Sequence, residues 1–250
     1  MKLLVYNIAY GTGSAGGIAG IFSAHRYLRT PGNVIDSIAS FINGSGADVV
    51  GLVEIDTGSF RTGYLDQTSL VAERLSGYSS CAVKYGVRSI GRTLPILRKQ
   101  ANAFFSKTRP HQIRNYYMPF GFKRLILEIN LNGIRFFLVH LALNRETRRR
   151  QLDYIKKIVS INPEPMIIGG DFNTFSGDSE LDTFIRDLDL YDPNVQGMPT
   201  FPSQAPKKKL DFILCSRSVK AVSFQVPDVR FSDHLPLILD FELQESHRLP

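Results

Sequence analysis

The 250-residue sequence contains no tryptophan and only two cysteines, Cys81 and Cys215. The two cysteines lie far apart and match no metal-binding spacing, so the sequence gives no support for a cysteine-ligated metal site. Cys215 lies in the apolar run DFILCS, where we expect a buried free thiol. A single disulfide between the two residues stays open as an alternative.

Apolar runs long enough for a transmembrane helix are also absent. The N-terminal segment MKLLVYNIAYG becomes polar too soon for a signal peptide. From these absences we expect a cytoplasmic protein, with peripheral contact with a membrane as an alternative.

Internal repeats, low-complexity tracts and linker-like stretches rich in proline or serine are missing as well. Because 43% of the residues are hydrophobic, the chain can form a sizeable core. We therefore predict a single domain over residues 1–250. The glycine-rich segment 11–32 lacks the Gly-Lys-Ser/Thr ending of a phosphate-binding loop. We expect it to be a mobile loop or a surface that contacts the substrate.

Acidic residues are fewer than basic ones, with 23 Asp and Glu against 30 Lys and Arg, a net charge of +7 and a pI near 9.4. This charge favours anionic partners such as nucleic acid, phospholipid headgroups or phosphorylated metabolites. A basic surface that merely keeps the protein soluble explains the charge equally well.

The hydrophobic pattern predicts alternating strands and helices. Helices are expected at 33–46, with Asn33 as the cap and Gly44–Gly46 as the end, and then at 66–76, 145–160 and 178–188. Strands are expected at 2–8, 47–55, 78–85, 100–107, 124–132, 134–143, 164–173, 207–216, 219–226 and 234–243. An Asn-Gly pair at 132–133 predicts a hairpin.

These elements predict an α/β (α+β) fold arranged as a four-layer sandwich. Two mixed β-sheets pack face to face, with helices on the outer faces. We expect each half of the chain to supply one sheet.

Several of the apolar strands end on a carboxylate, a carboxamide or an imidazole. These polar residues are Asn7, Glu54, His140, Asp171 and Asn173, together with Asp211 at the start of a strand and the Asp233–His234 pair before the last one. Ligand sites in layered α/β folds gather at strand ends. Each residue alone also fits a turn, a cap or a solvated strand end. The hypothesis of a site therefore depends on their convergence.

The chemistry of this set points to a metal-assisted hydrolysis. Carboxylate and carboxamide oxygens suit Mg²⁺, with Mn²⁺ as an alternative, and are poor ligands for a closed zinc site. One histidine can accept a proton from water while the other donates to a phosphoryl oxygen. No serine or cysteine lies in a nucleophile context, so direct attack by water is the simpler mechanism. We expect Gly169–Gly170 to let the backbone pass close to a phosphate.

Six sequence blocks, in order, resemble the signature blocks of the endonuclease/exonuclease/phosphatase superfamily: VYNI, GLVEI, LVHLAL, GGDFNT, LDFILCS and SDHLPL. The resemblance extends from residue 5 to about residue 240. The superfamily includes deoxyribonuclease-like nucleases, abasic-site endonucleases, inositol polyphosphate 5-phosphatases and neutral sphingomyelinases. The resemblance implies a metal-dependent hydrolase of phosphate esters.

The resemblance also implies a role for each matching residue. Asn7, Glu54 and Asp233 resemble the metal-binding residues, with Glu54 as the direct Mg²⁺ ligand. His140 resembles the histidine that hydrogen-bonds the scissile phosphate.

Asp171 and Asn173 resemble the pair that orients the attacking water or protonates the leaving oxygen and fixes a phosphate oxygen. His234 resembles the catalytic histidine, and Asp211 resembles the acid that orients it.

Two further blocks resemble parts of the family. QANAFFSK is similar to the GNAILS block of the phosphatase and sphingomyelinase branches, which implies that Asn102 contacts substrate. Arg148 and Gln151 lie in a helix segment common in the family, where they are either structural or reach the site.

The sequence departs from the DNA-repair branch, because Ala9 stands where abasic-site enzymes carry an acid and no tryptophan is present to wedge into a duplex. We expect the segments 11–32 and 109–124 to decide the substrate. The predicted partner is a small-molecule or lipid-headgroup phosphate ester, with nucleic acid as the alternative, and the predicted state is a monomer. A binding domain without catalysis is the third hypothesis, which the complete set of acids and histidines disfavours.

Overall fold

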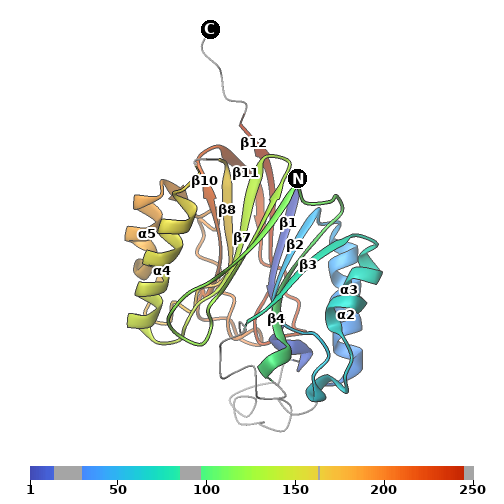
Figure 1. The fold of residues 1–250 in the computed structure, drawn as a ribbon. Helices are drawn as coiled ribbons and strands as arrows, with labels where there is room; N and C mark the ends of the chain where they lie inside the picture. The colour runs from blue at the N-terminus through green and yellow to red at the C-terminus, as the bar shows by residue number, and fades with distance from the viewer. Residues whose placement is uncertain (14–29, 85–96, 163, 245–250) are drawn as a thin grey trace.

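Two six-stranded sheets pack face to face in the computed structural model, which describes residues 1–13, 30–84, 97–162 and 164–244 (Figure 1). The first sheet has the order β11-β12-β1-β2-β4-β3. Its strands are β1 Lys2–Asn7, β2 Val49–Asp56, β3 Tyr78–Val83, β4 Gln100–Ser106, β11 Val219–Gln225 and β12 Leu237–Leu243. The second sheet has the order β5-β6-β7-β8-β10-β9. Its strands are β5 Gln112–Tyr117, β6 Leu125–Leu131, β7 Ile134–His140, β8 Met166–Asp171, β9 Leu190–Tyr191 and β10 Asp211–Ser216.

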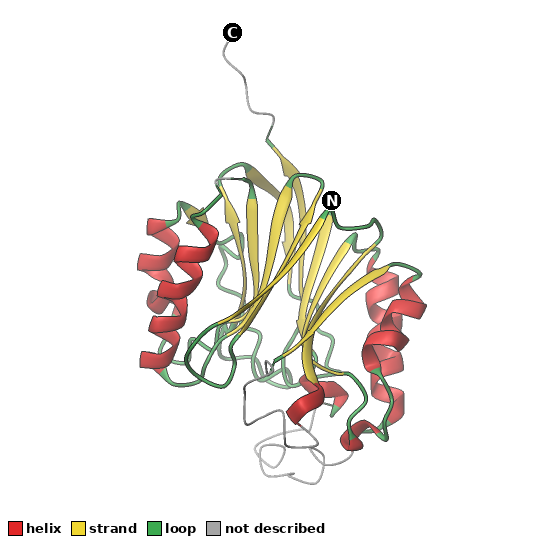
Figure 2. Ribbon diagram, in the orientation of Figure 1, coloured by secondary structure: helices red, strands yellow, loops and turns green. Residues whose placement is uncertain are grey.

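Helices cover the outer face of each sheet (Figure 2). Helices α2 (Gly32–Ser45) and α3 (Gln67–Leu75) cover the first sheet, and α4 (Arg145–Val159) and α5 (Asp182–Asp187) cover the second. Short 3-10 helices occur at η1 Ala9–Gly11, η3 Phe60–Thr62, η5 Leu97–Lys99 and η6 Asp178–Leu181. The predicted four-layer sandwich is confirmed.

Three apolar clusters fill the spaces between these layers. The cluster between the sheets includes Leu3, Leu127 and Phe136, which are all buried. Helix α2 packs Ile35 against the outer face of the first sheet, and helix α4 packs Ile155 against that of the second. Burial of apolar surface on both faces of each sheet explains why most of the strands read as continuous hydrophobic runs.

The prediction that each half of the chain supplies one sheet is wrong. Strands β11 and β12 come last in the described chain, yet β12 pairs antiparallel with β1 in the first sheet. The second sheet is built from the middle of the chain, strands β5 to β10. Strand pairing between distant segments leaves no mark in local hydrophobic periodicity, which explains the error.

Local features also differ from the prediction. Helix α2 begins at Gly32 after Pro31, and Asn33 does not cap it, although Gly46 ends it in a left-handed conformation as expected. The segment 109–124 contains the edge strand β5, which was not predicted, and its role in deciding the substrate stays a prediction. The predicted helix 178–188 is a 3-10 turn followed by the short helix α5.

Most of the predicted loop 11–32 lies outside the described residues. The two cysteines are both free, Cys215 buried as expected in the second sheet and Cys81 on a strand of the first, so the alternative disulfide is not formed. Among the described residues no helix is long and apolar enough to cross a membrane.

Parallel pairing brings several of the polar strand ends to one end of the sandwich. Strand β1 runs parallel to β2, and β7 runs parallel to β8, so the carboxyl ends of each pair meet at the same edge of their sheet. In the second sheet His140 pairs directly with Asp171 across the β7–β8 ladder. Asp211 on β10 pairs with Asp171 from the other side. Three neighbouring strands therefore present one acidic or imidazole side chain each in the same register.

Packing and backbone conformation explain why positions 169 and 170 are glycines. This explanation is separate from the predicted phosphate contact. A Cβ at Gly169 would lie 2.9 Å from Cγ2 of Val5 on the facing sheet, so the glycine lets the two sheets approach. At Gly170, φ is +144°, and a Cβ would lie 1.9 Å from the carbonyl oxygen of Val139. Strand β8 can therefore reach Asp171 in this register only with glycine at position 170.

We predict that Gly170→Ala destabilises the protein by about 3 kcal/mol, because the methyl group overlaps the β7 backbone and the φ angle is unfavourable for alanine. Urea denaturation measures the free energy of unfolding. Gly133→Ala is the matched control, since Gly133 has φ +75° with no atom within 4 Å of the added Cβ. The control should lose only about 1 kcal/mol. Equal losses in the two variants would contradict the proposed steric cause.

Candidate active site

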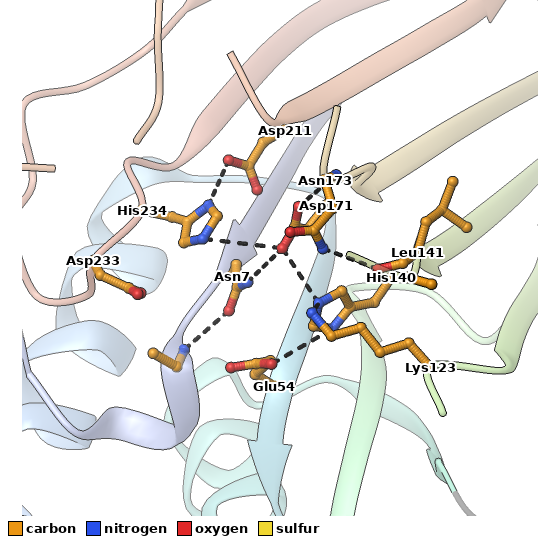
Figure 3. A network of polar contacts seen from close by, with 12 residues as sticks. Asn7, Glu54, Lys123, His140, Leu141, Asp171, Asn173, Asp211, Asp233 and His234 are labelled. Atoms are coloured by element: carbon orange, nitrogen blue, oxygen red, sulfur yellow. Dashed lines mark hydrogen bonds and ion pairs between the residues drawn. The ribbon is translucent and has the colours of Figure 1, made fainter. Parts of the chain in front are cut away.

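The residues predicted from the strand ends lie together at the carboxyl ends of the parallel strands (Figure 3). Hydrogen bonds or ion-pair contacts connect all of them except Asp233. The connected residues are Asn7, Glu54, Asn102, His140, Asp171, Asn173, Asp211 and His234.

The carboxylate of Asp171 lies at the centre of this network and joins the two sheets. Its Oδ2 accepts a hydrogen bond of 3.0 Å from Nδ2 of Asn7 on the first sheet. The same oxygen lies 3.3 Å from Nε2 of His140 and 3.9 Å from Nε2 of His234. Its Oδ1 accepts a bond of 2.9 Å from the backbone N–H of Asn173. Every donor that approaches this carboxylate comes from a residue predicted for the site.

These partners keep Asp171 ionised although it is buried. Burial alone would raise the pKa of the carboxyl group, but the charge of His234 and the hydrogen bond from His140 outweigh burial and hold this pKa well below its ordinary value. A buried carboxylate of this kind orients a water molecule well and retains a proton poorly.

His234 is paired with the second acid, Asp211. Its Nδ1 lies 2.7 Å from Oδ2 of Asp211, which also accepts a bond of 2.6 Å from the hydroxyl of Thr200. The ring of Phe201 lies against the imidazole at a centroid distance of 5.0 Å. Burial opposes protonation of His234, but the charges of Asp211 and Asp171 raise its pKa to about 10. This arrangement orients the ring and keeps it cationic.

His140 has the opposite electrostatic setting. Nδ1 lies 3.3 Å from Nζ of Lys84, and Nε2 contacts Nζ of Lys123. Burial, followed by the charges of Lys123 and Lys84, lowers the pKa of His140 to about 4. The two histidines therefore flank Asp171 in different charge states.

The two lysines are the site residues that sequence reasoning missed. Lys84 directly follows strand β3, in the run YSSCAVK, and so matches the rule that apolar strands end on polar residues at this site. Lys123 lies two residues before β6 and carries no such signal.

Glu54 extends the site on the first sheet. Its backbone has φ +59°, and its N–H approaches Oδ1 of Asn102 at 3.4 Å. Its Oε1 lies 3.7 Å from both Lys84 Nζ and His140 Nδ1. Burial opposes ionisation, but the Lys84 charge lowers the pKa of Glu54 to about 2. Asn102 is buried behind this strand end, and its contact with substrate stays a prediction.

The acidic groups fit a divalent cation. The carboxyl group of Asp233 points into the space beside Asn7 and Glu54 (Figure 3). Burial raises the pKa of Asp233, and the negative charges of Glu54 and Asp171 raise it further, so a cation among these three acids would relieve their repulsion. Their oxygens are the hard ligands that Mg²⁺ and Mn²⁺ prefer. That Asn7, Glu54 and Asp233 are the metal ligands stays a prediction.

A second arrangement of ligand atoms also fits a metal ion. Asp171, Asp211 and His234 each place one ligand atom so that all lie within 4.8 Å of one another. The site as a whole therefore offers a cluster of Asp and His side chains that could bind a metal.

Helix α4 supports the site from behind, which decides between the two roles left open for Arg148 and Gln151. Arg148 is buried, donates to the carbonyl oxygens of Ala142 at 2.8 Å and Leu143 at 3.0 Å, and pairs with Glu180. Gln151 accepts from the N–H of Ala142 at 2.8 Å and donates to the carbonyl of Lys123 at 2.7 Å. Both side chains hold the segment that follows His140, and Gln151 also holds the loop that carries Lys123.

The sequence model of the Endonuclease/Exonuclease/phosphatase family matches residues 4–234. The chain belongs to this family. Members of the family are metal-dependent hydrolases of phosphate esters, in agreement with the Asp and His cluster described above. The blocks quoted from the sequence lie almost entirely inside the matched range.

Solved structures share the fold at low sequence identity. A mannosyl-6-phosphatase of Bacteroides thetaiotaomicron is similar with a TM-score of 0.73 and 16% identity, covering 97% of this chain and 100% of that one. The catalytic domain of human Nocturnin is similar with a TM-score of 0.67 and 16% identity, covering 98% and 93%. These likenesses show the fold, and they do not transfer a substrate.

A UPF0294 protein of Yersinia pseudotuberculosis is 31% identical over 121 residues, which is 48% of this chain and 44% of the relative. The match thus spans less than half the length of this curated relative.

We predict opposite charge states for the two histidines in the metal-free protein at pH 7. His140 should be neutral, because its pKa is lowered to about 4, and His234 should be an imidazolium, because its pKa is raised to about 10. Proton–nitrogen NMR of protein with ¹⁵N-labelled histidine measures both, with His140→Gln and His234→Gln assigning the signals. Two neutral rings, or two charged ones, would contradict this description of the site.

The same pKa shifts give the direction in which the free energy of unfolding depends on pH. The folded-state pKa of His234 lies above the ordinary value of 6.5, so its stabilising pairing is complete below that value and is lost as pH rises through about 10. The folded-state pKa of His140 lies below 6.5. The contribution of its neutral form to folding stability is therefore complete above pH 6.5 and is lost as pH falls through about 4.

Proposed function

We propose that this protein is a Mg²⁺-dependent phosphodiesterase or phosphatase that cleaves its ester by direct attack of water. The observation that carries the proposal is the buried carboxylate of Asp171, whose Oδ2 lies 3.3 Å from Nε2 of His140 and 3.9 Å from Nε2 of His234. The pKa shifts of the three groups favour an ionised Asp171, a neutral His140 and a charged His234. This set supplies an acceptor for the attacking water and two donors for phosphoryl oxygens, which is what hydrolysis of a phosphate ester requires.

Each residue has a task in this mechanism. Asp171 aims the water oxygen at phosphorus and accepts its proton as the new P–O bond forms and the ester P–O bond breaks, and the proton then passes to the released ester oxygen. His140 and His234 donate hydrogen bonds to phosphoryl oxygens as negative charge accumulates on them. Asn173 donates from Nδ2 to the carbonyl oxygen of Leu141 at 2.9 Å and thereby fixes the segment after Asp171. Asn7, Glu54 and Asp233 would hold Mg²⁺. When bound, the ion polarises a phosphoryl oxygen and stabilises the leaving oxygen.

We predict that Asp171→Asn lowers kcat on the true substrate by about 10³-fold, because the amide has the same shape but is a poor acceptor for the water proton. The assay is a Mg²⁺-dependent panel of bis-p-nitrophenyl phosphate, phospholipids, inositol phosphates, plasmid DNA and RNA, with EDTA as the metal-free arm. Asp189→Asn is the control, since Asp189 is an exposed acid that pairs with Arg217. Turnover by Asp171→Asn at the wild-type rate would refute the proposal.

A lipid-linked ester is the substrate class that we favour. Three large apolar side chains on the loops next to the site are exposed, Phe122 by 80%, Leu143 by 63% and Phe175 by 37%. Phe122 precedes Lys123, Leu143 follows the His140 strand end, and Phe175 follows Asn173. A contiguous exposed apolar surface marks membrane or ligand contact, and we infer that these three side chains form such a surface beside the site.

These side chains are also linked to the site and to positive charge. Phe175 packs edge to face on Phe201 at 6.0 Å, and Phe201 lies against His234 at 5.0 Å. The exposed Lys208 donates from Nζ to the carbonyl oxygen of Phe175 at 3.0 Å. Apolar side chains beside a lysine suit a phospholipid surface, where the rings enter the interface and the ammonium group meets phosphate.

The alternative function is a Mg²⁺-dependent endonuclease or exonuclease on DNA or RNA, which the high pI and the basic runs Arg148–Arg150 and Lys207–Lys209 favour. The contacts of these runs give it weaker support. On helix α4, Arg148 is buried against Glu180, and Arg149 pairs with Glu146 and Asp153. In the 207–209 run, Lys209 pairs with Asp178 and Asp192. Arg148, Arg149 and Lys209 are therefore paired with acidic side chains of this chain, which leaves less of the positive charge of the two runs free to contact a phosphate backbone.

We predict that Phe122→Ser combined with Phe175→Ser lowers kcat/KM on phospholipid vesicles by about 10-fold or more and changes kcat/KM on a soluble phosphate ester less than about 2-fold, because the rings contribute apolar burial only at an interface. Ile161→Ser is the matched control, since Ile161 is 77% exposed and follows the far end of α4. An equal loss on both substrates would contradict a membrane role for these rings.

A further inference from the structure

Lys84 is a buried lysine for which the hydrolytic mechanism above has no task. Its exposed fraction is 3%. Its Nζ lies 2.9 Å from the hydroxyl oxygen of Tyr10, 3.3 Å from Nδ1 of His140 and 3.7 Å from Oε1 of Glu54. An ammonium group has three protons, and each has a neighbour here. Lys84 is therefore directed at a particular atom of His140 and does not extend toward solvent.

Tyr10 fixes the position of this lysine. Its carbonyl oxygen accepts a bond of 2.8 Å from Nε2 of Gln67. Its ring lies close to two cations, with the guanidinium of Arg61 4.0 Å and the ammonium of Lys84 5.0 Å from the centroid. Ala9 and Tyr10 have φ angles of 44° and 57°, which non-glycine residues rarely adopt. Strain of this kind persists at functional sites only where neighbouring contacts hold it.

The contact with Nδ1 selects the tautomer of His140. A neutral imidazole carries one N–H and one lone pair, and an ammonium group can only donate. Nδ1 beside Lys84 must therefore present its lone pair, which places the ring proton on Nε2. An acceptor is available there, since Oδ2 of Asp171 lies 3.3 Å from Nε2.

Lys123 contacts Nε2, and its ammonium group by itself would favour a lone pair on that nitrogen. The Nε2–H tautomer nevertheless satisfies the two enclosed neighbours, Lys84 at Nδ1 and Asp171 at Nε2, and the Nδ1–H tautomer would satisfy neither of them. Lys123 is half-buried on the loop before β6, whereas Lys84 is fully enclosed and tied to Tyr10. With the ring proton on Nε2, Lys123 and His140 become two donors directed at the same place. Two adjacent donors fit an anionic oxygen that approaches both of them.

We propose that Lys84 is a positioning residue that holds His140 as the Nε2–H tautomer, and that Tyr10 holds Lys84 in place. The proposal rests on the proposed function for its catalytic consequence, namely that the Nε2–H is aimed at a phosphoryl oxygen. Without the ammonium group, the nearest partner of Nδ1 is the Glu54 carboxylate at 3.7 Å, which favours a proton on Nδ1. The Nε2 lone pair would then face the substrate and repel it.

The test uses Lys84→Met, which keeps the length of the side chain and removes the donor. Two-bond proton–nitrogen correlation spectra of ¹⁵N-histidine-labelled protein at pH 7 report the tautomer, and His140→Gln assigns the signals. We expect the Nε2–H form in the wild type and a measurable population of the Nδ1–H form in Lys84→Met, in which Asp171 still favours a proton on Nε2 but nothing excludes one from Nδ1. We expect kcat to fall by about 10²-fold, the effect of losing one oxyanion donor, while KM changes less than about 3-fold.

Two further variants keep the test decisive. Lys84→Arg should restore the Nε2–H form and bring kcat to within about 10-fold of the wild type, because it returns a cationic donor. If Lys84→Met does not fold, Tyr10→Phe keeps the ring and removes the hydroxyl, and it should populate both tautomers. An unchanged Nε2–H form in every folded variant would overturn the proposal.

The spectra also separate this proposal from the proposed function. A wild-type protein that hydrolyses no phosphate ester would remove the proposed function, yet the tautomer shift would still decide what Lys84 does to His140. A tautomer shift with unchanged kcat would overturn the catalytic consequence of the Lys84 contact and leave the proposed function standing.

Discussion

The buried carboxylate of Asp171 is the interaction on which the rest of the site depends. It contacts Asn7 from the first sheet, His140 from the second sheet and His234 from the loop before β12, so it joins the two layers where catalysis would occur. A charge that is removed from water in this way is tolerated only when its donors are complete. The same requirement explains why Gly170 must let strand β8 reach this position without distorting the neighbouring β7 backbone.

Much of this arrangement could be predicted from the sequence, because two of its causes are local. Buried strands in a layered fold read as apolar runs, and a polar residue at the end of such a run has to find a partner. This reasoning predicted the four layers and selected residues as distant as Asn7 and His234, which the structure joins through Asp171. The order of the six blocks then indicated the family that the match over 4–234 shows. The roles of the individual residues stay predictions.

The parts that could not be predicted have causes that are not local. Lys84 resembles any lysine at a strand end until the fold encloses it between Tyr10 and His140. Lys123 reaches the site only because β6 pairs with β7 and brings its preceding loop beside His140. Strands β11 and β12 belong to the first sheet because β12 pairs with β1 and β11 pairs with β12. The hydrophobic periodicity of a segment does not indicate which strand it pairs with.

The pairing of β12 with β1 has a consequence for the synthesis of the protein. The α-amino group of Met1 donates to the carbonyl oxygen of Phe241 at 2.7 Å, a contact across 240 positions of the chain. A ribosome releases β1 first and its neighbour β12 only after every other strand, so the first sheet stays incomplete throughout synthesis. His234 emerges just before β12. The first sheet and the candidate site therefore both stay incomplete until this last described segment has been translated.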